Sequence, residues 1–179
     1  AAGERLSPKD AVLLDDLGVD SVRVRERASV GVVATGTEIH EGTQPDRDSN
    51  MLLGLAHSWG HDAVHAGTAP DEYDAVRDLL ADAAAAHDVV VSTGGTSVGH
   101  GDHVVVALAD LGELVVHGVA LRPGKPVTVA HLPDHDAVAV ALPGKPVAAH
   151  TAACLGARPL FAGTASLPTV PATATVDLD

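Results

Sequence analysis

The chain has 179 residues and a formal net charge of −13, with 24 acidic against 11 basic side chains. This charge argues against a nucleic-acid-binding protein, which needs a basic face, and it is typical of a halophilic protein from a high-salt cytoplasm, where charge repulsion is screened. Hydrophobic residues make up 46% of the chain. Because no run of about 18 apolar residues occurs, we expect no membrane-spanning segment and a cytoplasmic location.

The first half of the sequence alternates helix and strand patterns. A capping Ser7 begins a predicted helix that Gly18 ends. Five further elements follow: a charged, peripheral strand at 21–25, a central strand at 29–34, a helix at 51–59 capped by residues 48–50, a strand at 61–65 and an amphipathic helix from Asp71 to about Ala86.

The second half continues the alternation. It predicts a strand at 88–91, a helix at 103–111, a strand at 113–121, two paired strands at 127–132 and 137–142, and a helix at 147–160. Strands that alternate with helices predict an α/β fold, with three αβα layers and a mainly parallel sheet.

A glycine-rich loop joins the strand at 88–91 to the helix at 103–111. It runs from Ser92 to Asp102 and contains four glycines. Glycines let the backbone approach a ligand closely, and the amides before a helix attract anions. Asp102 at the end of the loop would repel a phosphate unless a metal ion or a proton intervenes. We therefore keep two interpretations of Asp102, a catalytic carboxylate and a plain helix cap.

The motif Pro-Gly-Lys-Pro occurs twice, at 123–126 and 143–146, and holds two of the three lysines of the chain. Pro-Gly predicts a type II turn in both places. Since the turn itself needs no lysine, we favour a pair of cations, Lys125 and Lys145, that face an anionic ligand. The alternative is two structural turns with solvated lysines. Neither motif is a phosphate P-loop, because proline follows each lysine.

Four carboxylates fall at predicted strand ends or helix starts: Glu38, Asp48, Asp71 and Asp102. The carboxyl ends of parallel strands share one edge of a sheet, so these side chains could converge there. Carboxylates beside lysines and glycine loops suit Mg²⁺ and an anionic ligand. For Asp48 and Asp71, plain helix capping is the stronger interpretation.

These motifs together resemble the molybdopterin molybdenumtransferase family. They are Thr35-Gly36-Thr37-Glu38, Asp48-Ser49-Asn50, the Gly94–Gly99 loop with Asp102, and the two Pro-Gly-Lys-Pro segments. The resemblance implies that the chain binds adenylylated molybdopterin, cleaves its pyrophosphate link with Mg²⁺ to release AMP, and inserts molybdate. The chain departs from the family where Thr37 replaces Asp, Lys145-Pro146 replaces Asn-Pro, and Ala148 replaces a frequent Ser.

The resemblance also implies roles for individual residues. Catalysis falls to Asp102, Glu38 and Asp71, and metal binding to Glu38 and Asp102. The residues expected to bind ligand and phosphate are Thr35, Gly36, Ser92, Gly94, Gly95, Thr96, Ser97, Gly99, Pro123, Gly124, Lys125, Pro143, Gly144 and Lys145.

The resemblance further implies a molybdopterin-binding domain at 27–163. Residues 1–26 would end a preceding region, and residues 164–179 would form a linker or begin a C-terminal β domain. It implies a molybdopterin adenylyltransferase as the upstream partner and a homo-oligomer in the full-length protein. Two alternatives remain: a molybdopterin-binding module without turnover, and a molybdopterin adenylyltransferase, which shares the fold and the Gly-Gly loop.

Overall fold

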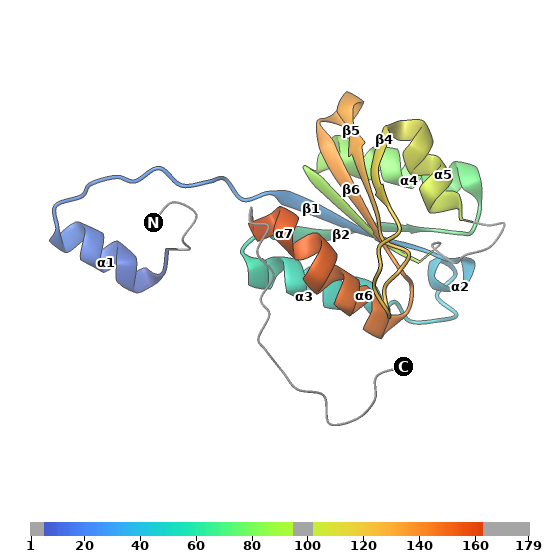
Figure 1. Cartoon of the computed structure of the whole chain (residues 1–179), viewed down its shortest axis with the longest axis horizontal. Helices are drawn as coiled ribbons and strands as arrows, with labels where there is room; N and C mark the ends of the chain where they lie inside the picture. Colours follow the sequence, from blue (N-terminus) through green and yellow to red (C-terminus); the bar gives the residue numbers. More distant parts are fainter. Residues whose placement is uncertain (1–5, 95–101, 163–179) are drawn as a thin grey trace, which may run out of the picture.

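The computed structural model describes residues 6–94 and 102–162. It opens with helix α1 (Pro8–Asp16), where the backbone N–H of Ser7 donates to the Asp10 carboxylate at 2.7 Å. Helix α1 buries none of its residues and stands apart from the rest of the fold (Figure 1). The strand predicted at 21–25 is wrong, since this segment is exposed and extended without a neighbouring strand to pair with.

A six-stranded sheet forms the centre of the fold, in the order β2-β1-β3-β6-β5-β4. The strands are β1 (Ser29–Thr35), β2 (Asp62–Ala69), β3 (Val89–Thr93), β4 (Glu113–His117), β5 (Thr128–Leu132) and β6 (Ala137–Leu142). β2, β1, β3 and β6 are parallel, while β5 runs antiparallel to both β6 and β4. The mainly parallel sheet and the β5–β6 pair agree with the sequence prediction.

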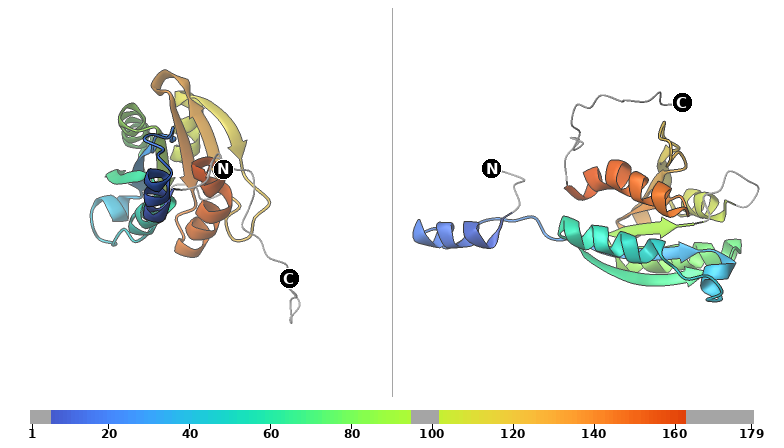
Figure 2. Two further views of the ribbon diagram at one scale, coloured as in Figure 1. Left: turned by 90° about the vertical axis from the view of Figure 1, so that its left-hand side faces the viewer. Right: turned by 90° about the horizontal axis from the view of Figure 1, so that it is seen from below.

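Helices cover both faces of this sheet (Figures 1 and 2). They are α2 (Thr37–His40), α3 (Asp48–Trp59), α4 (Tyr73–Ala86), α5 (His103–Leu111), α6 (Pro146–Ala152) and α7 (Arg158–Ala162). A π-helical turn (Ala153–Ala157) joins α6 to α7, and a 3₁₀ turn (Pro133–His135) joins β5 to β6. The predicted helix at 147–160 is therefore present but changes its hydrogen-bonding pattern midway.

Two separate apolar clusters establish the three layers. One cluster lies between the sheet and the α4–α5 pair and includes Leu80 and Leu108. The other lies on the opposite face, under α3 and α6, and includes Leu52 and Ala152. Successive side chains of a strand point to opposite faces, which explains why neighbouring valines of β1 and β3 fall in different clusters. The αβα prediction is confirmed.

Strand β4 is shorter than the predicted strand at 113–121. It ends at His117 because Gly118 adopts a left-handed conformation with φ of 80°. Val119 then hydrogen-bonds to the carbonyl oxygen of Lys125 at 2.9 Å, which closes a connection that leads back into β5. Across residues 6–94 and 102–162, no helix is both long enough and apolar enough to cross a bilayer.

Candidate functional site

The carboxyl ends of β1, β3 and β6 meet at one edge of the sheet, which we call the ligand edge. Gly94, just after β3, has φ of +88°, and a Cβ atom there would lie 2.3 Å from the carbonyl oxygen of Thr35. A Cβ atom on Gly144, just after β6, would lie 2.9 Å from the Cα atom of Gly94. Three segments from the predicted ligand-binding set are therefore in backbone contact, and only glycine fits at these approaches.

Glu38 lies beside the end of β1. Its carboxylate oxygens are 3.3 and 3.4 Å from the position of a Cβ atom on Gly36, which has φ of +142°. The N–H of Gly36 donates to the carbonyl oxygen of Ala69 at 3.0 Å, which fixes the turn against the end of β2. The exposed Glu38 side chain therefore folds back over the Thr35–Gly36 backbone rather than pointing away from it.

Asp71 adjoins the same turn. Its backbone N–H donates to the hydroxyl oxygen of Thr37 at 3.1 Å. The cap position of α4 is Glu72, which makes no side-chain capping bond, so Asp71 does not cap this helix as the simpler interpretation expected. Thr37, one of the positions at which the sequence departs from the family pattern, thus connects the start of α2, which carries Glu38, to the segment that carries Asp71.

Asp102 caps α5. Its carboxylate accepts a hydrogen bond from the N–H of Val105 at 3.2 Å. Burial raises the pKa of Asp102, while the bond from Val105 and the nearby His117 and His103 act in the opposite direction. The capping interpretation is thus confirmed.

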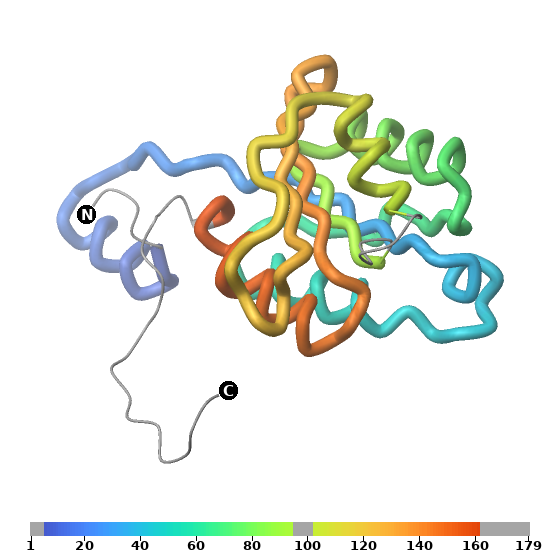
Figure 3. Tube along the Cα trace, turned by 45° about the vertical axis from the view of Figure 1, so that its right-hand side comes forward, coloured from blue at the N-terminus to red at the C-terminus, as the bar shows by residue number. Residues whose placement is uncertain are grey.

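The two Pro-Gly-Lys-Pro segments differ in conformation. Gly124 has φ of +118°, as a type II turn needs at this position, and its Cβ position lies 3.5 Å from the carbonyl oxygen of Ala148 in α6. Gly144 has no positive φ, so the type II prediction is wrong there, because this segment connects β6 directly to α6. Figure 3 shows the first turn lying against the start of α6. Both lysines, Lys125 and Lys145, are exposed.

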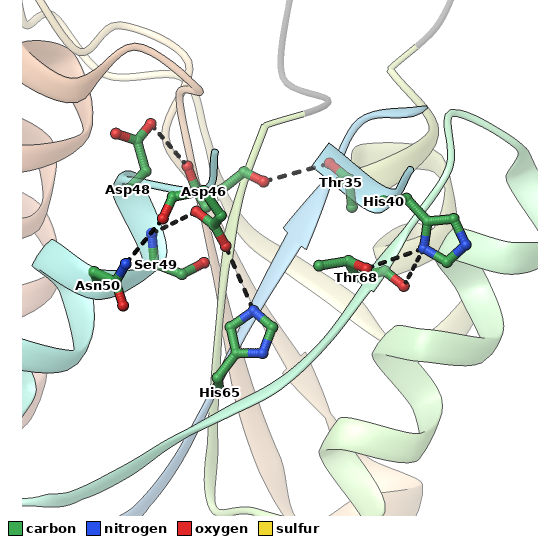
Figure 4. Close-up of polar contacts among 9 residues, drawn as sticks. Thr35, His40, Asp46, Asp48, Ser49, Asn50, His65 and Thr68 are labelled. Atoms are coloured by element: carbon green, nitrogen blue, oxygen red, sulfur yellow. Dashed lines mark hydrogen bonds and ion pairs between the residues drawn. The ribbon is translucent and has the colours of Figure 1, made fainter. Parts of the chain in front are cut away.

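Asp48 differs most from its predicted role. It is the first residue of α3 and makes no capping bond. Asp46, which precedes the N-cap residue Arg47, instead provides the capping side chain, because its carboxylate accepts from the N–H of Ser49 at 3.0 Å (Figure 4). Asp48 points to the end of β3, where the hydroxyl of Thr93 donates to Oδ2 at 3.4 Å. Only 9% of Asp48 is exposed, and Oδ1 has no hydrogen-bond partner among the described residues.

Burial and neighbouring charge act together on Asp48. Desolvation raises the pKa of its carboxyl group, the Thr93 hydroxyl lowers it, and the nearby Asp46 raises it. Ser92, a predicted ligand residue on β3, is also buried with an unpartnered hydroxyl. The ligand edge therefore contains two buried polar atoms, Asp48 Oδ1 and Ser92 Oγ, that lack partners among the described residues, which is unusual in folded proteins. No sequence pattern reveals the burial of Asp48, although Asp46, three residues before Ser49, has the spacing of a capping residue.

The structure does not bring the predicted carboxylates into one cluster. Within residues 6–94 and 102–162, no three His, Cys, Asp or Glu side chains are arranged to hold a metal ion. The predicted Gly95, Thr96, Ser97 and Gly99 lie outside the described residues.

A family model described as the probable molybdopterin binding domain matches residues 31–162. Two relatives are named molybdopterin molybdenumtransferase. The Synechococcus elongatus protein is 28% identical over 90% of this chain and 42% of its own length. The Nostoc protein is 33% identical over 82% of this chain and 36% of its own length. The chain thus spans about two fifths of the relatives it matches.

Solved structures give the same result for the fold. The molybdopterin biosynthesis moeA protein of Pyrococcus horikoshii is 30% identical, with a TM-score of 0.77 over 90% of this chain and 41% of that chain. The tungsten cofactor synthesizing protein MoaB of Pyrococcus furiosus is 19% identical, with a TM-score of 0.64 over 77% of this chain and 95% of that chain. The second likeness concerns the fold alone.

Proposed function

This chain belongs to the family of the probable molybdopterin binding domain, a domain of molybdenum cofactor biosynthesis, and we propose that it acts as a molybdopterin molybdenumtransferase. In this proposal the ligand edge binds adenylylated molybdopterin and accepts molybdate, and AMP leaves when the pyrophosphate link is cleaved. The observation that carries the proposal is the backbone contact among Thr35, Gly94 and Gly144. Three loops from separate strands there form one edge at the carboxyl ends of the sheet, where open α/β folds bind ligands.

Each group at this edge has a part in the proposed reaction. Backbone amides of the loop after β3 hold the phosphates, and Lys125 and Lys145 supply positive charge to them. Asp102 orients a water molecule that attacks the adenylyl phosphorus. The new P–O bond forms as the bond to the bridging oxygen breaks, which gives AMP and molybdopterin phosphate. Asp71 keeps the Thr37 turn in place through its N–H.

We propose that Glu38 and Asp102 take part in holding a magnesium ion. Glu38 and Asp102 offer carboxylate oxygens, the ligands that Mg²⁺ prefers, and magnesium commonly completes its shell with water and substrate phosphates. When bound, the ion would reduce the charge repulsion at the pyrophosphate link.

Further proposals concern the protein context. The curated relatives match most of this chain but are longer than it. We therefore propose that a homo-oligomer of the full-length protein completes the activity, and that a molybdopterin adenylyltransferase supplies the adenylylated substrate. We propose a cytoplasmic location, as expected for this chemistry.

A molybdopterin adenylyltransferase is the second candidate function. The sequence also shares with that enzyme class the Gly-Gly loop, and the fold matches a MoaB structure over 95% of that chain. Against it, the paired Pro-Gly-Lys-Pro segments, one of which packs on α6, are the feature by which the sequence resembles the transferase.

The test is incubation of the chain with adenylylated molybdopterin, Mg²⁺ and molybdate, followed by measurement of AMP. Release of AMP supports the proposal. Ligand binding without AMP release favours a binding module, and consumption of ATP with molybdopterin favours the adenylyltransferase. Asp134→Asn, in the exposed turn between β5 and β6, is a matched control for carboxylate variants because this turn lies at the opposite edge of the sheet.

A further inference from the structure

The Asp48 carboxyl group has an incomplete set of hydrogen bonds. Oδ2 accepts from the hydroxyl of Thr93 at 3.4 Å, while the buried Oδ1 has no partner among the described residues. Native proteins pair nearly all buried polar atoms, and an exception requires an explanation. Asp48 lies in the first turn of α3, where the helix dipole favours a carboxylate, but it makes no capping bond, so the helix end supplies no hydrogen bond to Oδ1.

Burial and the neighbouring Asp46 favour a neutral form of Asp48, in opposition to the dipole of α3, which favours the ionised form. Asp46 is the charged neighbour that acts on it, and a like charge disfavours ionisation. The imidazole of His65 pairs with Asp46, with Nε2 3.4 Å from Oδ2 (Figure 4), and not with Asp48. Lys145 precedes α6, which packs against α3, but no interaction joins it to Asp48 in the described structure. A buried carboxyl group without a cation retains a proton more readily than an exposed one.

The position of Asp48 connects it to the ligand edge. Thr93, its partner, is the last residue of β3 and comes directly before Gly94. The carbonyl oxygen of Thr93 accepts a bond from the Thr35 hydroxyl at 3.4 Å, so the same residue joins Asp48 to the end of β1. Asp48 is therefore one residue contact away from the loops that are in backbone contact.

We propose that Asp48 is a protonated acid whose Oδ1 donates a hydrogen bond to an anionic oxygen of the ligand. This inference rests on the proposed function. Oδ2, as the carbonyl oxygen of the acid, accepts from Thr93, and Oδ1 carries the proton that lacks an acceptor in the chain. A carboxylic acid kept neutral by its surroundings can donate to an oxyanion without repelling it. Asp48 is thereby a specificity residue for anionic ligands, distinct from the carboxylates Glu38 and Asp102 assigned to magnesium.

Two variants separate a donor from a carboxylate. Asp48→Asn keeps the size of the side chain and an N–H donor, whereas Asp48→Ala removes the donor. Binding of inorganic pyrophosphate and of adenylylated molybdopterin is measured by calorimetry from about pH 5 to about pH 9, the span over which buried carboxyl groups titrate. The ratio of wild-type to Asp48→Asn affinity at each pH removes the titration of the ligand itself.

At the low end of this range we expect equal affinity for wild type and Asp48→Asn, and about tenfold or greater loss for Asp48→Ala. As the pH rises, wild-type affinity should fall about tenfold relative to Asp48→Asn, because an ionised Asp48 repels the anion. Loss of binding in Asp48→Asn at low pH, or a relative gain of wild-type affinity at high pH, would overturn the inference, since either requires a carboxylate. Unchanged melting temperatures confirm that each variant is folded.

A second measurement does not depend on the ligand. The infrared difference spectrum between wild type and Asp48→Asn should contain the C=O band of a protonated carboxyl group at the lowest pH of the binding series, and the band should disappear as the pH rises. Thr93→Val should move the disappearance of this band to higher pH, because the Thr93 hydroxyl favours the ionised form. Absence of the band overturns the inference even if the ligand binds. Absence of ligand binding by every variant overturns the proposed function instead.

Discussion

Replacement of Gly94 by alanine tests the packing of the ligand edge. The added Cβ atom would lie 2.3 Å from the carbonyl oxygen of Thr35, and the alanine would have to adopt the φ of +88° that Gly94 has. Both the positive φ and the short contact with the Thr35 carbonyl oxygen therefore destabilise the Gly94→Ala variant. The neighbour is a backbone atom in a strand of the central sheet, so it has little freedom to move away.

Two further glycines separate these effects. Gly42 has φ of +72° and nothing within 4 Å of its Cβ position, while Gly144 has no positive φ and would place Cβ 2.9 Å from the Cα atom of Gly94. The left-handed conformation costs alanine about 1–2 kcal/mol, and overpacking costs about 1–3 kcal/mol. We therefore expect Gly42→Ala to lower the free energy of unfolding by about 1 kcal/mol, Gly144→Ala by about 1–3 kcal/mol, and Gly94→Ala by about 2–5 kcal/mol.

Thermal and urea unfolding measure these differences. At this chain length about 1 kcal/mol corresponds to about 2–4 °C in melting temperature, so Gly94→Ala should melt well below Gly42→Ala. Gly54→Ala, in α3 with open space around it, is the control and should be neutral or stabilising by up to about 1 kcal/mol. If Gly94→Ala and Gly42→Ala proved equally stable and equally able to bind adenylylated molybdopterin, the backbone contact between β1 and β3 would be refuted.

Four other predictions can be checked. Lys125→Ala and Lys145→Ala should each weaken binding of adenylylated molybdopterin by about 1–3 kcal/mol with little change in melting temperature, and affinity equal to that of the exposed Lys9→Ala control would make both turns purely structural. Asp102→Asn should keep the helix cap and ligand binding but lose Mg²⁺-dependent AMP release about a hundredfold; unchanged release would reduce Asp102 to a cap. Lowering the salt from molar concentration to about 0.1 M should lower the melting temperature, because screening of the acidic surface weakens, and a flat or rising value contradicts the halophilic interpretation. Hydrogen bonds from the N–H and hydroxyl of Ser29 lower the pKa of Asp88 in the folded protein. The stability that Asp88 contributes is therefore present above the pKa of the unfolded chain and is lost as the pH falls through the lower pKa of the folded protein. A parallel pH dependence of the melting temperature in wild type and Asp88→Asn would contradict this contribution.

The fold could be predicted because the amino-acid composition of its central strands identifies them as buried strands. Runs of valine, as at 89–91, mark strands buried on both faces, and the helices between them show clear ends at Gly60 and Gly112. The strand predicted at 21–25 failed for a tertiary reason. Its residues alternate as a strand would, yet a strand forms only where a partner can complete its hydrogen bonds, and this segment lies away from the sheet.

The site could be predicted at the level of loops but not of individual contacts. Carboxyl ends of parallel strands share an edge by topology, which is why the Thr35, Gly94 and Gly144 segments meet. The sequence could not indicate that Gly144 lacks a left-handed conformation, because Pro-Gly fits more than one connection. Nor could it separate Asp46 from Asp48: both carboxylates stand near the start of α3, and only packing determines that the first caps the helix and the second is buried against Thr93.

The glycines of the ligand edge are needed for the packing of the fold itself, apart from any contact with a ligand. A glycine-rich loop is usually explained by close approach of a ligand, yet Gly94 and Gly144 first allow three strands to bring their own backbones together. Asp48 and Ser92 are buried near the same end of β3, and their atoms Oδ1 and Oγ remain unpaired in the described structure. Tight backbone packing and unsatisfied polar atoms therefore occur together at this edge. A ligand that supplies hydrogen-bond acceptors at this edge would remove the energetic cost of the unpaired polar atoms without disturbing the backbone packing.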